Sequence, residues 1–562
     1  MAIDPEKVET NQVVFQDANQ PVSLAESAGT SDRQSSKETG SSKAVESSAD
    51  SVGATPAPPE VPTHANPKHV LSPSRTIVVV PRSKRRGLLG SLTIIPEVDS
   101  PYNYANSTKW MITLVIAVAS AAAPLASAIF FPALSRLAEE FHASQTLTNL
   151  TVALYLLSMA IFPLWWSAFS EALGRRTVYL ISFALFTIWS IVAAVSTSMA
   201  MLIVVRVLGG GASSSVLAIG AGTIADIWEP KERGHAMGIF ILGPMLGPLL
   251  APIIGGVLSQ SWGWRSTQWF QTIYGGLLLI VLTFCLPETL ARRAPSVEQQ
   301  AAVDSVPGPT RSKFTQRTIQ GALFLKRSII DPLKILRYLR FPAVFVTVWL
   351  SSVTFGSLYM LNIAIQRTFE KPPYNFSEII VGLTYIPGSL GYMVAGILGG
   401  RWADAIMKRE ARSAGRFDAS GKLILRPEDR MRENALLAAA IYPAALIWFG
   451  WTAERGVFWI APLIANFFFG FGTMIIFGTA NTMLTEFLPK RSSSGVAVST
   501  FVRTIFSCVG TVIAQPILTA IGDGWLFTIL AIVGWISAFA VIWAMKTFGP
   551  RWQNDMREKL AQ

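Results

Sequence analysis

Two arginines lie in long, mainly apolar stretches of this chain, and they are the side chains best placed there to do chemistry. Arg206 follows Leu202-Ile-Val-Val, and Arg503 follows Val496-Ala-Val-Ser499-Thr-Phe-Val. A cation within hydrocarbon costs several kcal/mol, on scales that run from about 2.5 to over 10, so it usually faces a cavity or a partner. No Asp, Glu or His lies at the centre of these apolar stretches. The two guanidinium groups therefore predict a positive cavity that suits an anionic or zwitterionic ligand.

The elements that must hold these arginines are apolar runs of membrane-spanning length. AVILMFWYC residues make up 51% of the chain and charged residues only 15%, whereas an average soluble domain is about 25% charged. A spanning helix needs roughly 20 apolar residues. We therefore expect an all-α membrane protein with twelve transmembrane helices, near 110–133, 148–169, 177–197, 199–222, 235–258, 266–286, 341–365, 377–400, 434–451, 456–480, 495–520 and 524–547.

The basic residues alternate between loops, which predicts the topology. Ten Lys or Arg lie between Arg292 and Arg340, and nine between Arg401 and Arg432. Cytoplasmic loops carry an excess of such residues, so both loops and both termini should face the cytosol. The same alternation accounts for the net charge of +12 without a nucleic-acid partner. The expected partners are the lipid bilayer, protons and a small-molecule substrate, and we expect a monomer.

The expected domain boundaries follow from these spans. Residues 1–108 lack hydrophobic periodicity and are rich in Ser, Ala, Pro and charge, which is typical of a disordered cytosolic tail. Two six-helix bundles should occupy 109–286 and 341–547, with a cytosolic central loop at 287–340 and a short cytosolic tail at 548–562. Cys285 and Cys508 both fall within expected spans, so we expect no disulfide framework and no metal site.

A short charged motif recurs in both halves of the chain. Glu171-Ala-Leu-Gly174-Arg175-Arg176 ends the second span, and Asp404-Ala-Ile-Met-Lys408-Arg409 ends the eighth. In each, two bases follow an acid by four and five residues. At a helix end such residues can receive a helix dipole and bridge to carboxylates, which would form a latch between the two halves. The alternative is an ordinary boundary of the positive-inside kind.

The fifth span carries small residues and prolines at four-residue spacing. This spacing keeps the small residues close to one helical face, where another backbone can approach, and each proline removes an N–H from the helix. We expect this span to act in gating, although an ordinary packing face would have the same composition. The residues concerned are Gly243, Pro244, Gly247, Pro248, Ala251, Pro252, Gly255 and Gly256.

Taken together, four stretches resemble the major facilitator superfamily, and within it the fungal twelve-span drug:proton antiporter group. They are the Glu171–Arg176 loop, the fourth span with Arg206-Val-Leu-Gly-Gly-Gly211, the fifth span, and a set of markers that includes Leu286-Pro-Glu288-Thr289. The run around Arg503 is more similar to the spore-wall dityrosine exporter branch. Glu171 stands where the superfamily usually has Asp.

This resemblance implies export by alternating access, proton antiport, a plasma-membrane location and no cofactor beyond a proton gradient. The family associates the arginine that matches Arg206 with proton coupling. Among the peripheral titratable groups, Asp226 is the preferred proton carrier and Glu171 another candidate, along with His235, Asp404 and Glu486. A gating-loop ion pair would explain Asp226 almost equally well.

Polar and aromatic residues of the spans are the remaining candidates for substrate contacts. With Arg503 we select Tyr155, Tyr359, Asn362, Tyr385 and Asn466, and we expect fewer than half of the eligible side chains to touch a ligand, because pockets use few polar groups. Asn375-Phe-Ser377 and Asn149-Leu-Thr151 are candidate glycosylation sites.

Three functional alternatives stay open. The leading hypothesis is an exporter of drugs, toxins or secondary metabolites. The second is a dedicated exporter of one anionic or zwitterionic metabolite, such as an organic acid or a dityrosine-like compound, and the third is a membrane sensor without transport. An enzyme is not expected, because no nucleophile elbow, phosphate loop or catalytic His/Cys/Asp cluster is evident.

Overall fold

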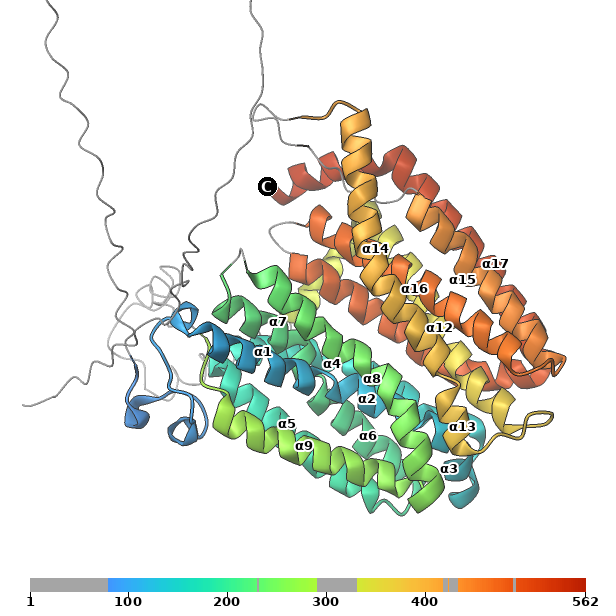
Figure 1. Ribbon diagram of the computed structural model, residues 1–562, viewed down its shortest axis with the longest axis horizontal. Helices are drawn as coiled ribbons and strands as arrows, with labels where there is room; N and C mark the ends of the chain where they lie inside the picture. Colours follow the sequence, from blue (N-terminus) through green and yellow to red (C-terminus); the bar gives the residue numbers. More distant parts are fainter. Residues whose placement is uncertain are drawn as a thin grey trace, which may run out of the picture. The chain divides into compact units, whose positions relative to one another are not determined.

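Long apolar helices make up most of the chain that the computed structural model describes, which is residues 79–229, 232–290, 331–417, 423, 433–488 and 492–561 (Figure 1). In the first half they are α1 (Asn106–Ser120), α2 (Ala122–Ala128), α3 (Leu134–Glu140), α4 (Gln145–Leu173), α5 (Arg175–Ala194), α6 (Met199–Ser213), α7 (Ser215–Ile227), α8 (Arg233–Trp262) and α9 (Arg265–Cys285). In the second half they are α12 (Pro342–Glu370), α13 (Glu378–Leu383), α14 (Ile386–Ser413), α15 (Glu433–Glu454), α16 (Ile460–Phe487) and α17 (Ser492–Ala561).

Several of these helices combine into single spans. The described residues contain 11 helical segments that are long and apolar enough to cross a membrane, and the last, Ser494–Met556, has 63 residues. At 1.5 Å per residue it would measure about 95 Å, roughly three times the hydrocarbon core. Gly522 divides α17, because its φ of 81° and ψ of 174° are not helical. The segment therefore supplies two spans, which gives the twelve transmembrane helices that the sequence predicts.

The helices pack as two groups that meet along two seams. In the first group α5 packs against α6 and α9, and in the second α12 packs against α17 and α14 against α16. Figure 1 shows the blue-to-green helices together and the yellow-to-red helices together. Contacts of α4 with α17, and of α8 with α13, join the groups.

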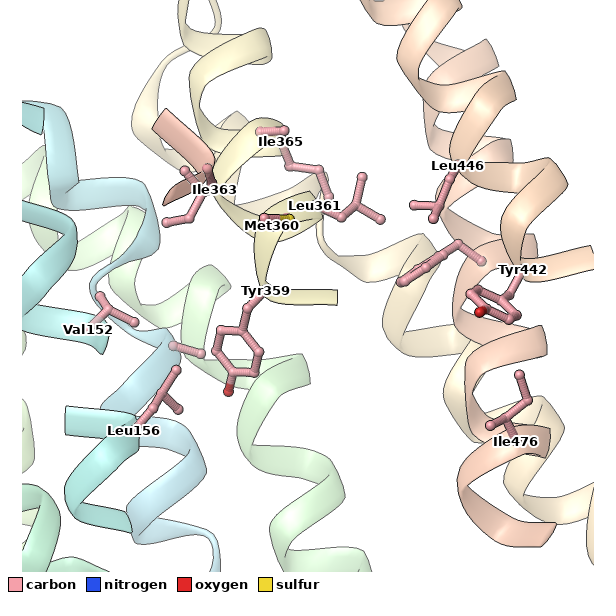
Figure 2. Close-up of a cluster of buried hydrophobic side chains, with 14 of the residues drawn as sticks. Val152, Leu156, Tyr359, Met360, Leu361, Ile363, Ile365, Tyr442, Leu446 and Ile476 are labelled. Carbon is pink, nitrogen blue, oxygen red and sulfur yellow. The ribbon is translucent and has the colours of Figure 1, made fainter. Parts of the chain in front are cut away.

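An apolar cluster runs through the seam between α4 and α12. Figure 2 shows Val152 and Leu156 of α4 beside Tyr359 of α12, and the same buried cluster continues to Tyr442 of α15 and Ile476 of α16. Because lipid tails are as apolar as these side chains, helix association in a membrane depends on close van der Waals packing more than on exclusion of water.

The small residues of α8 let its backbone approach the first span. A Cβ atom added at Gly243 would lie 1.9 Å from the Ala117 carbonyl oxygen, and one added at Gly255 would lie 2.1 Å from the Ile129 carbonyl oxygen. The expected close approach of another backbone is therefore present. The helix remains continuous through Pro244, Pro248 and Pro252.

A second face of α8 approaches the other half. A Cβ atom at Gly256 would lie 2.4 Å from the Glu378 carbonyl oxygen, and one at Gly382 of α13 would lie 2.4 Å from the Pro252 carbonyl oxygen. One helix thus contacts both the first span and the opposite half through backbone atoms.

Residues 79–105, before α1, make defined contacts with the helices, whereas the sequence predicted a disordered tail through residue 108. Arg86 Nε lies 2.6 Å from Glu97 Oε1, and the backbone N–H of Ile94 donates to the Phe284 carbonyl at 2.8 Å. The expectation failed because these contacts are made by polar and backbone atoms that leave no hydrophobic periodicity. Residues 1–78 lie outside the described residues.

Arg176 anchors this segment to the helices. Its side chain is fully buried and donates from Nε to the Leu88 carbonyl at 2.9 Å and from Nη2 to the Leu89 carbonyl at 2.9 Å and the Thr283 carbonyl at 2.8 Å. A planar guanidinium with five donors suits such a set of carbonyls.

Other domain boundaries in the structure also differ from those expected from the sequence. In the expected central loop, residues 291–330 lie outside the described residues, and Asp331–Arg340 forms a 3-10 helix. The eighth span continues as helix α14 to Ser413, and α17 continues to Ala561, so the expected tail at 548–562 is largely helical.

Replacing Gly243 by Val tests the close approach of α8 to α1. We expect Gly243→Val to lower the free energy of unfolding by at least about 1–3 kcal/mol, because the new Cβ overlaps a carbonyl oxygen that cannot rotate away. Thermal unfolding of the purified protein in detergent measures this. Gly238→Val is the matched control, because a Cβ atom there meets nothing within 4 Å. Equal melting temperatures for the two variants would contradict the packing argument.

Replacing Arg176 tests the anchoring of residues 79–105. We expect Arg176→Gln to raise amide hydrogen exchange in residues 85–94 by about tenfold or more, because local opening then breaks fewer bonds. Arg82→Gln is the control, since Arg82 is exposed. Unchanged exchange in Arg176→Gln would show that other contacts hold the segment.

Candidate functional site

Arg206 lies buried on α6, on the side of the first half that carries Tyr155. It is 2% exposed. Its Nη1 donates to the Ala126 carbonyl oxygen at 2.9 Å, and its guanidinium lies 4.2 Å from the ring centre of Phe130 and 4.4 Å from that of Tyr155. Nε and Nη2 are buried without a hydrogen-bond partner in the described part of the chain. Two strong donors of a buried cation thus lack a partner in the described part of the chain.

The glycines after Arg206 fix the position of Tyr155. A Cβ atom at Gly210 would lie 2.9 Å from the Tyr155 carbonyl oxygen, so glycine lets α6 pack directly against α4. The Tyr155 hydroxyl then hydrogen-bonds the Ser213 hydroxyl at 2.7 Å.

Arg503 occupies a comparable position in the second half. Its guanidinium lies 4.9 Å from the ring centre of Phe355 and 5.6 Å from that of Phe477, and its buried Nε has no partner among the described residues. Tyr359 interacts electrostatically with Arg503 and with Tyr155. Figure 2 shows Tyr359 at the seam, beside Leu156 of α4. Tyr155 thus lies beside Arg206 in the first half, and Tyr359 acts on Arg503 in the second.

Three other predicted contact residues have different surroundings. Tyr385 stacks on Phe131 at 5.7 Å and donates its hydroxyl to the Asn362 carbonyl at 2.7 Å. The Asn466 side chain is buried and donates to the Thr384 carbonyl at 3.5 Å. Tyr385 and Asn466 thus hold helices together, and of these three only Asn362 has a side chain without such a bond among the described residues.

The phenylalanine rings around the arginines were not predicted, whereas Tyr155 was. Phe355 precedes Tyr359 by four residues, so helical spacing alone places it on the same face, and this signal was available in the sequence. Phe130 and Phe477 approach the arginines through tertiary packing, which one sequence does not reveal.

The bonds of the predicted gating loop, Glu171–Arg176, lie within the first half. Arg175 Nε lies 3.1 Å from Asp226 Oδ2 of α7, and Arg175 Nη1 donates to the Ser170 hydroxyl at 2.6 Å. Asp226 is 20 residues from Arg206 (226 minus 206), or about 30 Å along a helix. The geometry therefore agrees with the gating-loop ion pair and not with a direct relay between Asp226 and Arg206.

Glu288 caps the helix that begins with these arginines. Its carboxylate accepts the backbone N–H of Arg175 at 2.9 Å and of Arg176 at 3.2 Å. Burial raises the pKa of Glu288, while these hydrogen bonds and the charge of Arg86 oppose that rise. Gly174 has a φ of 92°, and a Cβ atom there would lie 2.3 Å from Glu288 Oε2. Sequence reasoning had used Glu288 only as a family marker.

The predicted latch between the halves is not formed at this end in the present conformation, because the bonds of Arg175 and Arg176 stay within the first half, and it stays a prediction. In the second copy, Arg409 bonds to Glu433 at 2.9 Å, also within its own half. Lys408 and Glu171 are exposed, and Glu171 has no hydrogen bond or ion pair in the described part. The side chains of Asp404 and Glu486 lie outside the described residues.

The halves are joined at the opposite end of the bundle, which we call the α3–α13 end. Arg136 of α3 pairs with Glu378 of α13 at 2.9 Å. The Ser135 hydroxyl donates to Glu370 of α12 at 2.5 Å, and the Ile379 N–H donates to the Gln260 side chain at 3.0 Å. These contacts join residues that lie more than 100 positions apart in the sequence, so they could not be predicted from it.

The two glycosylation candidates differ in exposure. Asn149 lies within α4 and is 1% exposed, which contradicts its selection because an acceptor must be accessible. Asn375 is exposed in the loop before α13, at the α3–α13 end, with a φ of 51°.

The sequence is similar to fungal transporters. It matches the family model of the Major Facilitator Superfamily over residues 116–514. It is 51% identical to the MFS transporter OpS2 of Beauveria bassiana, over 61% of this chain and 97% of that protein. It is 34% identical to the MFS antiporter QDR3 of Candida albicans over 83% and 82% of the two chains, and 30% identical to quinidine resistance protein 3 of Saccharomyces cerevisiae over 85% and 88%.

Solved structures share the fold. The xylose transporter XylE of E. coli, in a partially occluded inward-open conformation, matches with a TM-score of 0.57 and 17% identity, over 79% of this chain and 98% of that one. A bacterial homologue of the human lysosomal transporter Spinster matches with a TM-score of 0.54 and 13% identity, over 81% and 98%. The chain belongs to the major facilitator superfamily, and it is a membrane transporter and not an enzyme.

Proposed function

We propose that this transporter exports small organic molecules from the cytosol by proton antiport, and that its cavity prefers anionic or zwitterionic substrates. The observation that carries the substrate preference is the pair of arginines with unpartnered buried N–H groups, Arg206 in one half and Arg503 in the other. Export and antiport are supported by relatives named as an MFS antiporter and as the efflux pump radE of Floropilus chiversii.

The preference for an anion follows from the cost of burying a cation. Arg206 is stabilised by one carbonyl and two ring faces, and Arg503 by two ring faces, yet buried charges normally require a charged partner and full hydrogen bonding. A carboxylate that reaches both guanidinium groups would supply this and would bridge the halves. The flanking rings suit an aromatic body for such a substrate.

The proposed transport cycle is alternating access around this pair. In the present conformation, Arg136–Glu378 and the backbone approach of Gly256 to Glu378 close the α3–α13 end. Glu171 and Lys408 are exposed at the other end. We assign this as an inward-facing state, with α8 as the helix that must adjust to both halves, because its three prolines each remove a backbone hydrogen bond.

The proposed orientation places the α3–α13 end outside the cell and both termini in the cytosol. It is supported by the basic loops on the other side and by exposed Asn375 at the α3–α13 end. We propose a plasma-membrane location and a monomer that uses a proton gradient and no cofactor.

Efflux from fungal cells tests the charge of the substrate. We expect Arg206→Ala and Arg503→Ala each to reduce efflux of anionic compounds by about 10- to 100-fold, since a hydrogen bond to a charged group contributes about 1.5–3 kcal/mol. A panel of anionic, cationic and neutral compounds measures this, with a protonophore to abolish proton-driven export. Arg455→Ala is the control, because Arg455 stacks on Trp451 at 5.5 Å in the loop region outside the cavity.

Two results would contradict the proposal. Export of cationic drugs that is indifferent to both arginines would indicate a multidrug pump without a positive cavity. Ligand binding without any flux would indicate a sensor.

The glycosylation state tests the orientation. We expect Asn375→Gln to remove a glycan, seen as a loss of the mobility shift that a glycosidase produces, while Asn149→Gln leaves the shift unchanged because Asn149 is buried. A glycan that persists in Asn375→Gln would remove this support for the assignment.

A further inference from the structure

We propose that Glu370 is the proton-binding group of the antiport, and that its protonation holds the α3–α13 end closed. This inference rests on the proposed proton antiport, for which the sequence offers no carboxylate at the centre of a span. Glu370 lies at the last residue of α12 and was not among the predicted proton carriers.

Glu370 joins the two halves through hydrogen bonds. The Ser135 hydroxyl of α3 donates to Glu370 Oε2 at 2.5 Å, and the Gln366 side-chain amide, one turn earlier on α12, also donates to Oε2. Gln366 donates to the Ser135 oxygen at 2.7 Å as well. The two bonds to the carboxyl use one oxygen, which leaves Oε1 to carry a proton.

Glu370 is partly buried and lies near other carboxylates where the halves meet. Glu378 and Glu139 are the negative neighbours that act on it, and Lys371 is the positive one. Lys371 is exposed, so water screens it. Like charges brought together in a partly buried site disfavour ionisation of both.

The other charged groups at this end are engaged elsewhere. Arg136, which could neutralise Glu370, pairs with Glu378 at 2.9 Å and donates to the Ser259 carbonyl at 2.7 Å. Arg367 acts on Asp523 of α17. Tyr385 interacts electrostatically with Glu370, and its hydroxyl donates to the Asn362 carbonyl.

These contacts give the proton a defined effect on conformation. When the α3–α13 end is open, hydronium from the outer solution can transfer its proton to Glu370 Oε1, which forms an O–H bond and leaves water. Closing then brings together Glu370 and Glu378 without repulsion between two anions. Acid therefore shifts the equilibrium toward the inward-facing state, which is the direction needed to return an exporter for its next substrate. The cycle is completed when Oε1 gives its proton to water on the cytosolic side, which leaves the carboxylate and hydronium.

A distance measurement across the α3–α13 end tests this without any substrate. Spin labels at Trp262→Cys and Phe458→Cys, in a background with Cys285→Ala and Cys508→Ala, report on the two halves, since Trp262 is 72% and Phe458 66% exposed. We expect the ratio of closed to open molecules to rise by about tenfold or more between pH 8 and pH 5, because one proton is taken up on closing. In Glu370→Gln, a neutral amide that can still accept both bonds, the ratio should stay high at every pH.

The controls are carboxyl and imidazole groups at the same end. Glu140 accepts from the Trp264 indole and from Arg265, both within the first half, so Glu140→Gln should keep the pH response. His142→Gln, which removes the imidazole at this end, should keep it too. Each variant is compared with the parent protein only if the two elute at the same volume in size-exclusion chromatography.

Two outcomes would overturn the role of Glu370: a parent protein without a pH response, or a Glu370→Gln variant that keeps the response or keeps proton-driven export. A parent protein that shows the conformational pH response but no proton-driven export would instead contradict the proposed antiport. The proton-binding role of Glu370 would then remain.

Discussion

The structure depends on how closely α8 can approach its neighbours. In a membrane, apolar side chains gain little by leaving lipid for protein, so helices associate through van der Waals contact, and contact is closest where side chains are absent. Gly243 and Gly255 bring α8 onto the first span, while Gly256 brings it onto α13. A single helix can therefore transmit a movement of one half to the other, because the nearest atom at each of these contacts is a backbone carbonyl oxygen, which cannot rotate away as a side chain can.

Charge is distributed to match this arrangement. Arg175 and Arg176 are satisfied by Asp226 and by backbone carbonyls of their own half, so they make that half rigid at the gating-loop end. Arg136 and Ser135 instead bond across the halves at the other end. Rigid halves with polar contacts between them at one end are what a rocking motion requires, because the bonds within a half survive the motion and those between halves must break.

The sequence predicted the spans well because hydropathy and the length of a helix are local properties. The twelve helices, the small-residue face of α8 and the isolation of Arg206 all followed from runs of residues read in order. The hydrogen-bond partners of the polar residues could not be predicted in the same way. Ser135 and Glu370 are far apart in sequence, and their hydrogen bond depends on how the ends of α3 and α12 meet, which only tertiary packing decides. Glu288 was visible as a motif, yet its capping of α5 required the position of a helix that begins more than a hundred residues earlier.

Hydrogen-bond partners distinguish two buried arginines of the first half, Arg176 and Arg206. Arg176 is as buried as Arg206, and both belong to motifs that the sequence singled out. Arg176 donates to carbonyls from Nε and from both terminal nitrogens, so its burial is already compensated and its role is structural. Arg206 leaves Nε and Nη2 without partners among the described residues. The Ala126 carbonyl and two aromatic rings compensate the burial of Arg206 only in part. Hydrogen-bond satisfaction, and not burial or motif membership, therefore separates the two arginines, and the unpartnered N–H groups of Arg206 are what the proposed binding of an anion would explain.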